Sequence, residues 1–137
     1  MASSVIPVPI YDDARRAIEF LVDAFGFERH AVYEDEDGTI AHVELTFDGG
    51  MLMIGSATEG ELADFGTTVH EAGKPTSWLY VVVEAVDAHC ERARAAGAEI
   101  VMELRDKDYG GRDYTCRDFE GHLWTFGSYD PWATTGA

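Results

Sequence analysis

Basic residues and cysteines are scarce in this chain. Ten lysines and arginines stand against 26 aspartates and glutamates, which gives a net charge of −16. Such an excess of negative charge repels phosphate backbones and anionic lipid surfaces, so nucleic acids and membranes are disfavoured as partners. The two cysteines, Cys90 and Cys116, form neither a CxxC pair nor a dense framework. We therefore expect two reduced, buried thiols and no disulfide.

Long hydrophobic runs are also missing. No stretch of about 18 apolar residues occurs, which argues against a membrane-spanning helix. The opening residues, MASSVIPVPIYDD, lack the basic and the long apolar parts of a signal peptide, so we expect a cytoplasmic protein. With 137 residues, 46% of them hydrophobic, the chain can bury the core of one compact domain but not of two independent ones.

Two parts of the chain are similar to each other. The segment GHLWTFGS near the end matches the earlier segment GGMLMIGS. The interval from Gly26 to Gly50 is the same as the interval from Gly97 to Gly121. This spacing predicts one module present twice, with the second copy offset by the separation of Gly26 and Gly97. Each copy would have to bury the apolar face of its sheet.

The first module is expected to have the order β-α-β-β-β. Its elements are a strand over residues 5–11, a helix over residues 14–25, and strands over residues 27–33, 40–47 and 51–55. Pro7 and Pro9 suit an edge strand, because proline cannot donate a backbone hydrogen bond. Asp12 or Asp13 is expected to cap the helix, and Gly26 to end it.

The second module repeats this order. We expect a strand over residues 78–84, a helix capped by Asp87 that runs to Ala96, and strands over residues 99–104, 114–118 and 123–127. Trp124 and Phe126 should lie in the core beneath the helix. One compact domain would thus consist of a first module (1–57), a connection (58–77), a second module (78–130) and a tail (131–137). The connection is polar and glycine-containing, and is either a plain linker or a lid over a ligand.

Two β-α-β-β-β modules that end in GGMLMIGS and YGGRDYTCRDFEGHLWTFGS resemble the vicinal oxygen chelate superfamily. This superfamily includes glyoxalase I, ring-cleaving dioxygenases and bleomycin-resistance proteins. The resemblance implies an α+β fold in which tandem βαβββ modules form a curved mixed-sheet cup, and it implies a homodimer. It leaves the function open, because one fold hosts unrelated chemistries.

The resemblance also indicates where a metal ion would be bound. In metal-dependent relatives, His, Gln or Glu side chains on the first and last strand of each module hold a divalent ion. Carried over to this sequence, the last-strand positions are Ile54 and Thr125, and the first-strand positions are Ile6 and either Leu79 or Tyr80. None of these side chains is a competent ligand for a hard or borderline cation. We therefore expect that the metal site has been lost and that no cofactor is bound.

Strand 40–47 carries the candidate catalytic residues. Val43, Leu45 and Phe47 alternate with His42, Glu44 and Thr46. If the apolar set faces the helix, His42 and Glu44 face the cup, where they could act as a proton-transfer pair. The alternative is the half-solvated polar face of an ordinary sheet.

The remaining candidates are expected to line a small-molecule pocket with an apolar floor and a few polar groups. Tyr109 and Arg112, in a glycine-flanked loop, would close over the others. These are Ile6, Leu52, Ile54, Tyr80, Thr115, Arg117, Leu123 and Thr125.

The sequence thus favours a metal-independent protein that binds a small organic ligand, which the acidic composition suggests is cationic or aromatic. Whether the protein is an enzyme stays open. The alternatives are a glyoxalase-like lyase or isomerase, or a dioxygenase, with a divalent metal, and a metal-free acid–base enzyme that uses His42 and Glu44.

Overall fold

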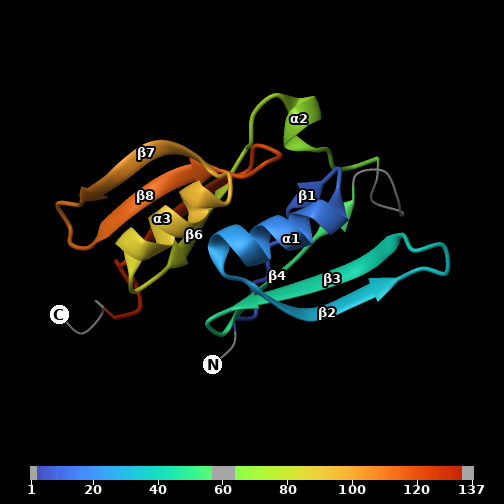
Figure 1. Ribbon diagram of the computed structural model, residues 1–137, viewed down its shortest axis with the longest axis horizontal. Coiled ribbons are helices and arrows are strands. Elements are labelled where there is room, and N and C mark those ends of the chain that lie inside the picture. The colour runs from blue at the N-terminus through green and yellow to red at the C-terminus, as the bar shows by residue number, and fades with distance from the viewer. Residues whose placement is uncertain (1–2, 57–63, 134–137) are drawn as a thin grey trace. The chain divides into compact units, whose positions relative to one another are not determined.

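The computed structural model describes residues 3–56 and 64–133, which divide into two compact units, Met1–Lys74 and Pro75–Ala137 (Figure 1). The first unit contains β1 (Ile10–Tyr11), α1 (Ala14–Phe25), β2 (Glu28–Glu34), β3 (Ile40–Phe47), β4 (Gly50–Met53), β5 (Gly55–Ser56) and α2 (Val69–Ala72). The second contains β6 (Trp78–Val82), α3 (Val86–Ala95), β7 (Glu99–Asp106), β8 (Arg112–Arg117) and β9 (Leu123–Gly127). The expected α+β fold with a repeated β-α-β-β-β order is confirmed.

Helix α1 begins after its N-cap Asp13 and ends before its C-cap Gly26. The Asp13 side chain accepts a hydrogen bond from the Arg16 amide, which satisfies one of the free amides of the first turn. Gly26 ends the helix in the left-handed conformation (φ 86°), and its amide donates to the Val22 carbonyl. The buried stripe of the helix consists of Ala17, Ile18, Leu21, Ala24 and Phe25.

The first unit has an antiparallel sheet of β2, β3 and β4, and a short parallel pair of β1 and β5. The segment before β1 runs beside β4, because the Pro7 and Pro9 carbonyls accept hydrogen bonds from the amides of Met53 and Gly55. The two prolines therefore sit where only acceptors are needed. Val43 and Leu45 are fully buried on the face of β3 that α1 covers.

The β3–β4 turn has two residues, and the corresponding β8–β9 turn has three. Asp48 and Gly49, both with positive φ, connect the paired residues Phe47 and Gly50. In the second unit, the Asp118 amide donates to the His122 carbonyl across three residues that end in left-handed Gly121. The offset between the last strands of the two modules is therefore one residue longer than the offset between the strands that precede them.

This difference of one residue corrects two predictions. Leu52 pairs with Leu45 and is 1% exposed, so it lies on the helix-covered face of the sheet. The Ile54 amide bonds to the Val43 carbonyl, and the Ile54 side chain is also buried. Neither side chain is on the open face. A shift of one residue along a strand moves every side chain to the other side of the sheet, and Met51 and Met53 take the open-face positions.

The Asp118 carboxylate shapes the longer turn. Its Oδ1 accepts hydrogen bonds from the amides of Glu120 and His122, and its Oδ2 accepts one from Trp124 Nε1, each at 3.0 Å. Asp118 is itself buried. One acidic side chain therefore ties the turn to the largest core residue of the second unit.

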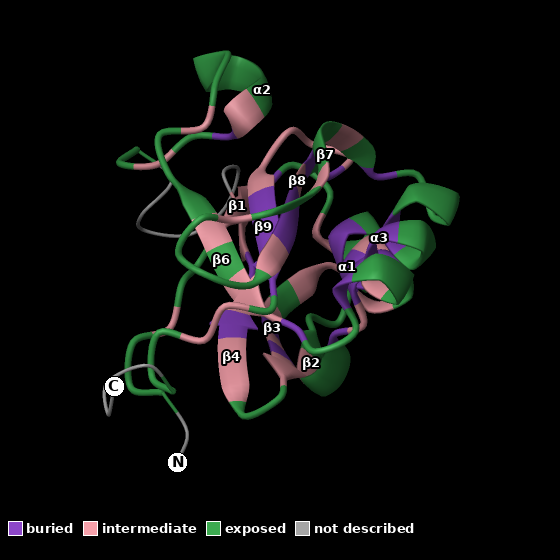
Figure 2. Cartoon of the chain, turned by 90° about the vertical axis from the view of Figure 1, so that its left-hand side faces the viewer, coloured by how far each residue is buried: buried purple, intermediate pink, exposed green. Residues whose placement is uncertain are grey.

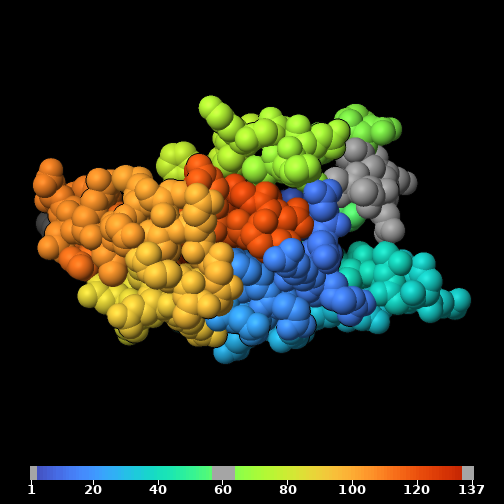
Figure 3. Space-filling model, turned by 45° about the horizontal axis from the view of Figure 1, so that its top comes forward, coloured from blue at the N-terminus to red at the C-terminus, as the bar shows by residue number. Residues whose placement is uncertain are grey.

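The second unit has one mixed sheet in the order β6-β9-β8-β7, with β6 parallel to β9. Helix α3 packs on one face. In the space-filling view its yellow surface lies directly against the light orange of β7 (Figure 3). Beneath the helix lie the fully buried side chains of Tyr114, Cys116, Trp124 and Phe126, within the purple strands of Figure 2. The prediction that Trp124 and Phe126 form core is thus confirmed.

One local prediction is wrong. Asp87 does not cap α3; the N-cap is Ala85, without a side-chain hydrogen bond, and Asp87 pairs with Arg112. The expected connection contains the one-turn helix α2, which Thr68 caps. Residues 57–63 of that connection and 134–137 of the expected tail lie outside the described residues. Cys90 and Cys116 are buried and free, as expected. In the described part of the chain, no helix is long and apolar enough to cross a membrane.

Candidate functional site

The sheet of the second unit has a face opposite α3, which we call the uncovered face because no helix in the described part of this unit packs on it. Thr125 and Asp113 on this face are nevertheless buried. Neighbouring strands place Tyr80, Thr125 and Thr115 in one row across this face. Trp78, Leu123 and Arg117 form the next row. Trp78 is 62% exposed and Tyr80 39% exposed. The structure thus brings together five residues that the sequence had placed in one pocket: Tyr80, Thr115, Arg117, Leu123 and Thr125.

The polar groups in these rows are largely paired with each other. Thr115 Oγ1 and Thr125 Oγ1 lie 2.7 Å apart, so one hydroxyl donates to the other. Arg117 forms an ion pair with Glu99 at 3.0 Å at the edge of the sheet. The aromatic rings are therefore the main groups that this face still offers to a ligand.

Tyr80 is held in one orientation. Its hydroxyl donates to the Tyr129 carbonyl at 2.7 Å, and its ring crosses over Gly127, where an added Cβ would lie 2.7 Å from the Tyr80 oxygen. Burial raises the pKa of Tyr80, and the negative charge of Asp113 raises it further. The phenol therefore remains a protonated donor at neutral pH. Tyr109, 61% exposed, meets the Tyr129 ring edge to face at 5.0 Å.

Arg112 does not lie on the uncovered face. It alternates with Asp113 along β8 and is directed to the helix side, where its Nε and Nη1 atoms bond Asp87 at 2.8 Å and Asp106 at 3.2 Å. These hydrogen bonds raise the pKa of Arg112 above its usual value. Arg112, which was predicted to contact the ligand, instead joins the start of α3 to the end of β7 through these two ion pairs.

A second polar group lies on the open face of the first unit. His42 Nε2 is 2.8 Å from Glu44 Oε2, and His30 Nε2 is 3.8 Å from Glu44 Oε1. The Tyr33 ring stacks on His42 at 6.0 Å. The expected His42–Glu44 contact therefore exists, and one carboxylate is placed between two imidazoles.

Sequence reasoning missed His30 because the pairing of β2 with β3 shifts between Arg29 and Ala31. Counting alternate residues fails across such an irregularity.

Ile6 is half-buried in the segment before β1.

Among the described residues, the positions that hold a divalent metal in metal-dependent relatives carry no suitable donors. With the corrected register, the last-strand positions of the metal-dependent pattern become Met53 and Thr125, and Tyr80 stands on the first strand of the second unit. Thioether, hydroxyl and phenol groups do not fit a hard or borderline cation. Within residues 3–56 and 64–133, no three His, Cys, Asp or Glu side chains are grouped so that they could hold a metal ion.

The thiols are not suited to nucleophilic chemistry. Burial raises the pKa of Cys116 to about 12, and it raises the pKa of Cys90 as well. Both remain protonated at neutral pH, and a thiol is a far weaker nucleophile than a thiolate. They contribute to the core of the second unit.

The repeated β-α-β-β-β units and their uncovered sheet faces define a class of protein. Residues 8–126 match the Glyoxalase/Bleomycin resistance protein/Dioxygenase superfamily, and the chain belongs to it. The predicted resemblance to vicinal oxygen chelate proteins is thereby confirmed.

Particular members of the superfamily are similar over nearly the whole chain. An uncharacterised protein of Mycobacterium bovis is 31% identical over 121 residues, which are 88% of this chain and 80% of the relative. The crystal structure of TioX from Micromonospora sp. ML1 is 38% identical with a TM-score of 0.73, and covers 91% of this chain and 94% of TioX. The fosfomycin resistance protein FosX from Listeria monocytogenes, solved with Mn(II) and sulfate, shares the fold at 18% identity, with a TM-score of 0.69 and coverage of 96% and 93%.

Proposed function

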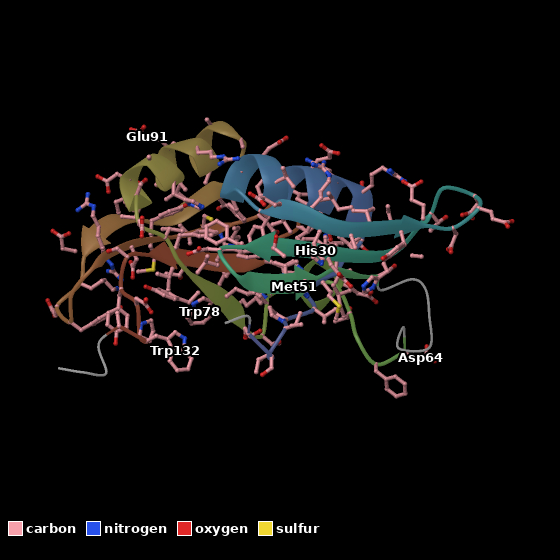
Figure 4. All side chains as sticks on the ribbon, turned by 90° about the horizontal axis from the view of Figure 1, so that it is seen from below. His30, Met51, Asp64, Trp78, Glu91 and Trp132 are labelled. Carbon is pink, nitrogen blue, oxygen red and sulfur yellow. The ribbon has the colours of Figure 1, made fainter. Side chains whose placement is uncertain are left out.

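We propose that this chain binds a small organic molecule on the uncovered face of the second unit and needs no metal ion to do so. The observation that carries this proposal is the exposure of Trp78 and Tyr80, two residues apart on one strand. Large aromatic side chains are costly to leave in water, and flat rings beside a few fixed polar groups are typical of ligand sites. In Figure 4, Trp78 lies on the side of the sheet opposite α3.

Metal independence is supported by the chemistry of the side chains. The positions that hold ligands in metal-dependent relatives carry Met53, Thr125 and Tyr80 here. Elemental analysis of protein purified without chelator tests this part of the proposal. About one equivalent of zinc, nickel, iron or manganese per chain would contradict it.

An aromatic or cationic ligand suits the charge of the chain. A net charge of −16 attracts cations and repels anions. The superfamily includes bleomycin resistance proteins as well as enzymes, and we propose that this chain sequesters its ligand. We further propose a homodimer, which sedimentation equilibrium would reveal as twice the chain mass of 15.1 kDa.

Three planar bicyclic probes test the binding site: 1-methylquinolinium, neutral quinoxaline and anionic naphthalene-2-sulfonate. The chain has three tryptophans, so their indole N–H signals can be followed separately by nuclear magnetic resonance. We expect the cation to shift the Trp78 signal in a saturable manner and to leave the signal of buried Trp124 in place. Trp132, 86% exposed, controls for nonspecific stacking. If no probe moves Trp78 more than Trp132, this face is not the ligand site.

A specific contact favours a second candidate, metal-free acid–base catalysis. His42 and Glu44 lie 2.8 Å apart on a half-exposed face. Exchange of the α-protons of a small oxo acid in D₂O tests it, because a positioned base typically contributes about a hundredfold to such a step. Glu44→Gln should abolish the enhancement, whereas Glu28→Gln on β2 should retain it. Equal rates with and without the wild-type protein would exclude this activity.

A further inference from the structure

The Asp113 carboxylate is largely buried, and one long ion pair holds it. Asp113 lies on β8, opposite Gly127 of β9 and on the same face as Thr115, and is only 8% exposed. Its ion-pair partner among the described residues is Lys107, whose Nζ is 3.8 Å from Oδ2. That distance is too long for a hydrogen bond. The Asp113 side chain is 11% exposed, so its carboxylate still reaches water and a cation can approach it. An ion pair alone seldom repays the desolvation of a carboxylate.

The nearest phenol does not supply the missing donor. The Tyr80 hydroxyl is close to Asp113, because both crowd the position that a Cβ on Gly127 would occupy, at 2.7 and 2.9 Å. However, that hydroxyl donates to the Tyr129 carbonyl. The 2.9 Å distance is to the Asp113 Cβ, so the glycine brings the Tyr80 ring next to the base of the Asp113 side chain.

One aromatic ring lies beside the Asp113 side chain, and two more lie near the end of the same sheet. Tyr80 lies beside it, and Tyr129 and Tyr109 form an edge-to-face pair at the end of the same sheet. Tyrosine faces attract ammonium groups, and the attraction increases where water is excluded. A carboxylate next to such rings has the chemistry of a site for an organic cation.

We propose that Asp113 anchors the ammonium group of the ligand, and that the Lys107 ammonium occupies this position when the ligand is absent. This inference rests on the proposed function and narrows its ligand class to arylalkyl amines. The ligand ring would pack on Tyr80, two residues from Trp78 on the same strand, and its ammonium would donate directly to Asp113. Lys107, with a side chain 20% exposed, would move toward solvent.

The test compares two probes of the same shape, 2-naphthylmethylammonium and neutral 2-naphthylmethanol, by titration of the Trp78 indole signal. We expect the ammonium to bind wild-type protein about tenfold more tightly than the alcohol, since hydrogen bonds between charged groups are the stronger kind. Asp113→Asn should remove this preference. Asp108→Asn is the matched control, because it removes one negative charge from an exposed position in the same hairpin. Lys107→Met should strengthen ammonium binding about threefold and leave alcohol binding unchanged.

Several results would contradict the proposal that Asp113 anchors the ammonium group. Equal affinities of the two probes for wild-type protein would do so, as would equal losses in Asp113→Asn and Asp108→Asn. Weaker ammonium binding by Lys107→Met would also refute it, and this variant decides the question if Asp113→Asn does not fold. If both probes bind equally and Trp78 still responds, the anchor is wrong but small-molecule binding stands. If neither naphthyl probe shifts the Trp78 signal while the planar bicyclic probes do, the anchor is again wrong but small-molecule binding stands.

Discussion

Gly127 is the position at which a single methyl group should disturb the candidate site most directly. An alanine Cβ there would lie 2.7 Å from the Tyr80 oxygen, 3.2 Å from its Cζ and 2.9 Å from Asp113 Cβ. The Asp113 atom is next to the backbone of a central strand and cannot move away cheaply. The Tyr80 ring would have to shift instead, and its 2.7 Å hydrogen bond to Tyr129 would be lost.

The expected cost of Gly127→Ala combines these two effects. Overpacking a tight site costs about 1–3 kcal/mol, and a lost hydrogen bond about 1 kcal/mol. We therefore expect the free energy of unfolding in urea to fall by roughly 2–4 kcal/mol, with an unchanged m-value. The Trp78 response to 1-methylquinolinium should weaken as well, because the neighbouring ring is displaced.

A double-mutant cycle with Tyr80→Phe tests the cause. Phenylalanine removes the oxygen that lies closest to the added methyl group, so part of the clash disappears. Gly127→Ala should then cost about 1 kcal/mol less in the Tyr80→Phe background than in the wild type. Additive effects, or a cost of Gly127→Ala below about 0.5 kcal/mol, would show that the Tyr80–Gly127 contact is not tight and refute the reasoning.

Three other predictions concern stability. Asp13→Ala should lower the free energy of unfolding by about 1 kcal/mol, and by more than Asp12→Ala, because Asp13 caps α1. Asp118→Ala should cost roughly 3 kcal/mol in the same urea assay, since three donors lose their buried acceptor; a loss under about 1 kcal/mol would mean that the turn forms without it. The pKa of Cys116 is raised from 9.0 to about 12 by burial, so its contribution is complete below pH 9 and lost as the pH rises to 12. Cys116→Ala should flatten the decline over that range, and identical pH profiles would contradict the assignment.

Much of the secondary structure could be predicted because its signals are local. The bounds of β3 (Ile40–Phe47) and β9 (Leu123–Gly127) agree with prediction, since alternation and flanking turn residues mark them. Helix α1 was predicted from its apolar spacing, one capping aspartate and one glycine. The spacing of the glycines also indicated the repeat, and the resemblance of the two module endings pointed to the superfamily.

The strand register could not be read from one sequence. Two turns that look alike differ by one residue, and that difference turned Leu52 and Ile54 into the core and brought Met51 and Met53 to the open face. An irregularity in β2 likewise concealed the approach of His30 to Glu44. Register depends on backbone geometry in the turn, which composition specifies only loosely.

The sequence by itself therefore determined the order of the main elements and the core stripe of α1. Only the tertiary structure decided which polar groups are paired. It committed Arg112 to Asp87 and Asp106, and left Asp113 beside Tyr80 with a distant lysine. The reason is physical: caps and periodicity act over a few residues, whereas the partner of a charged side chain is set by strands that meet only after folding.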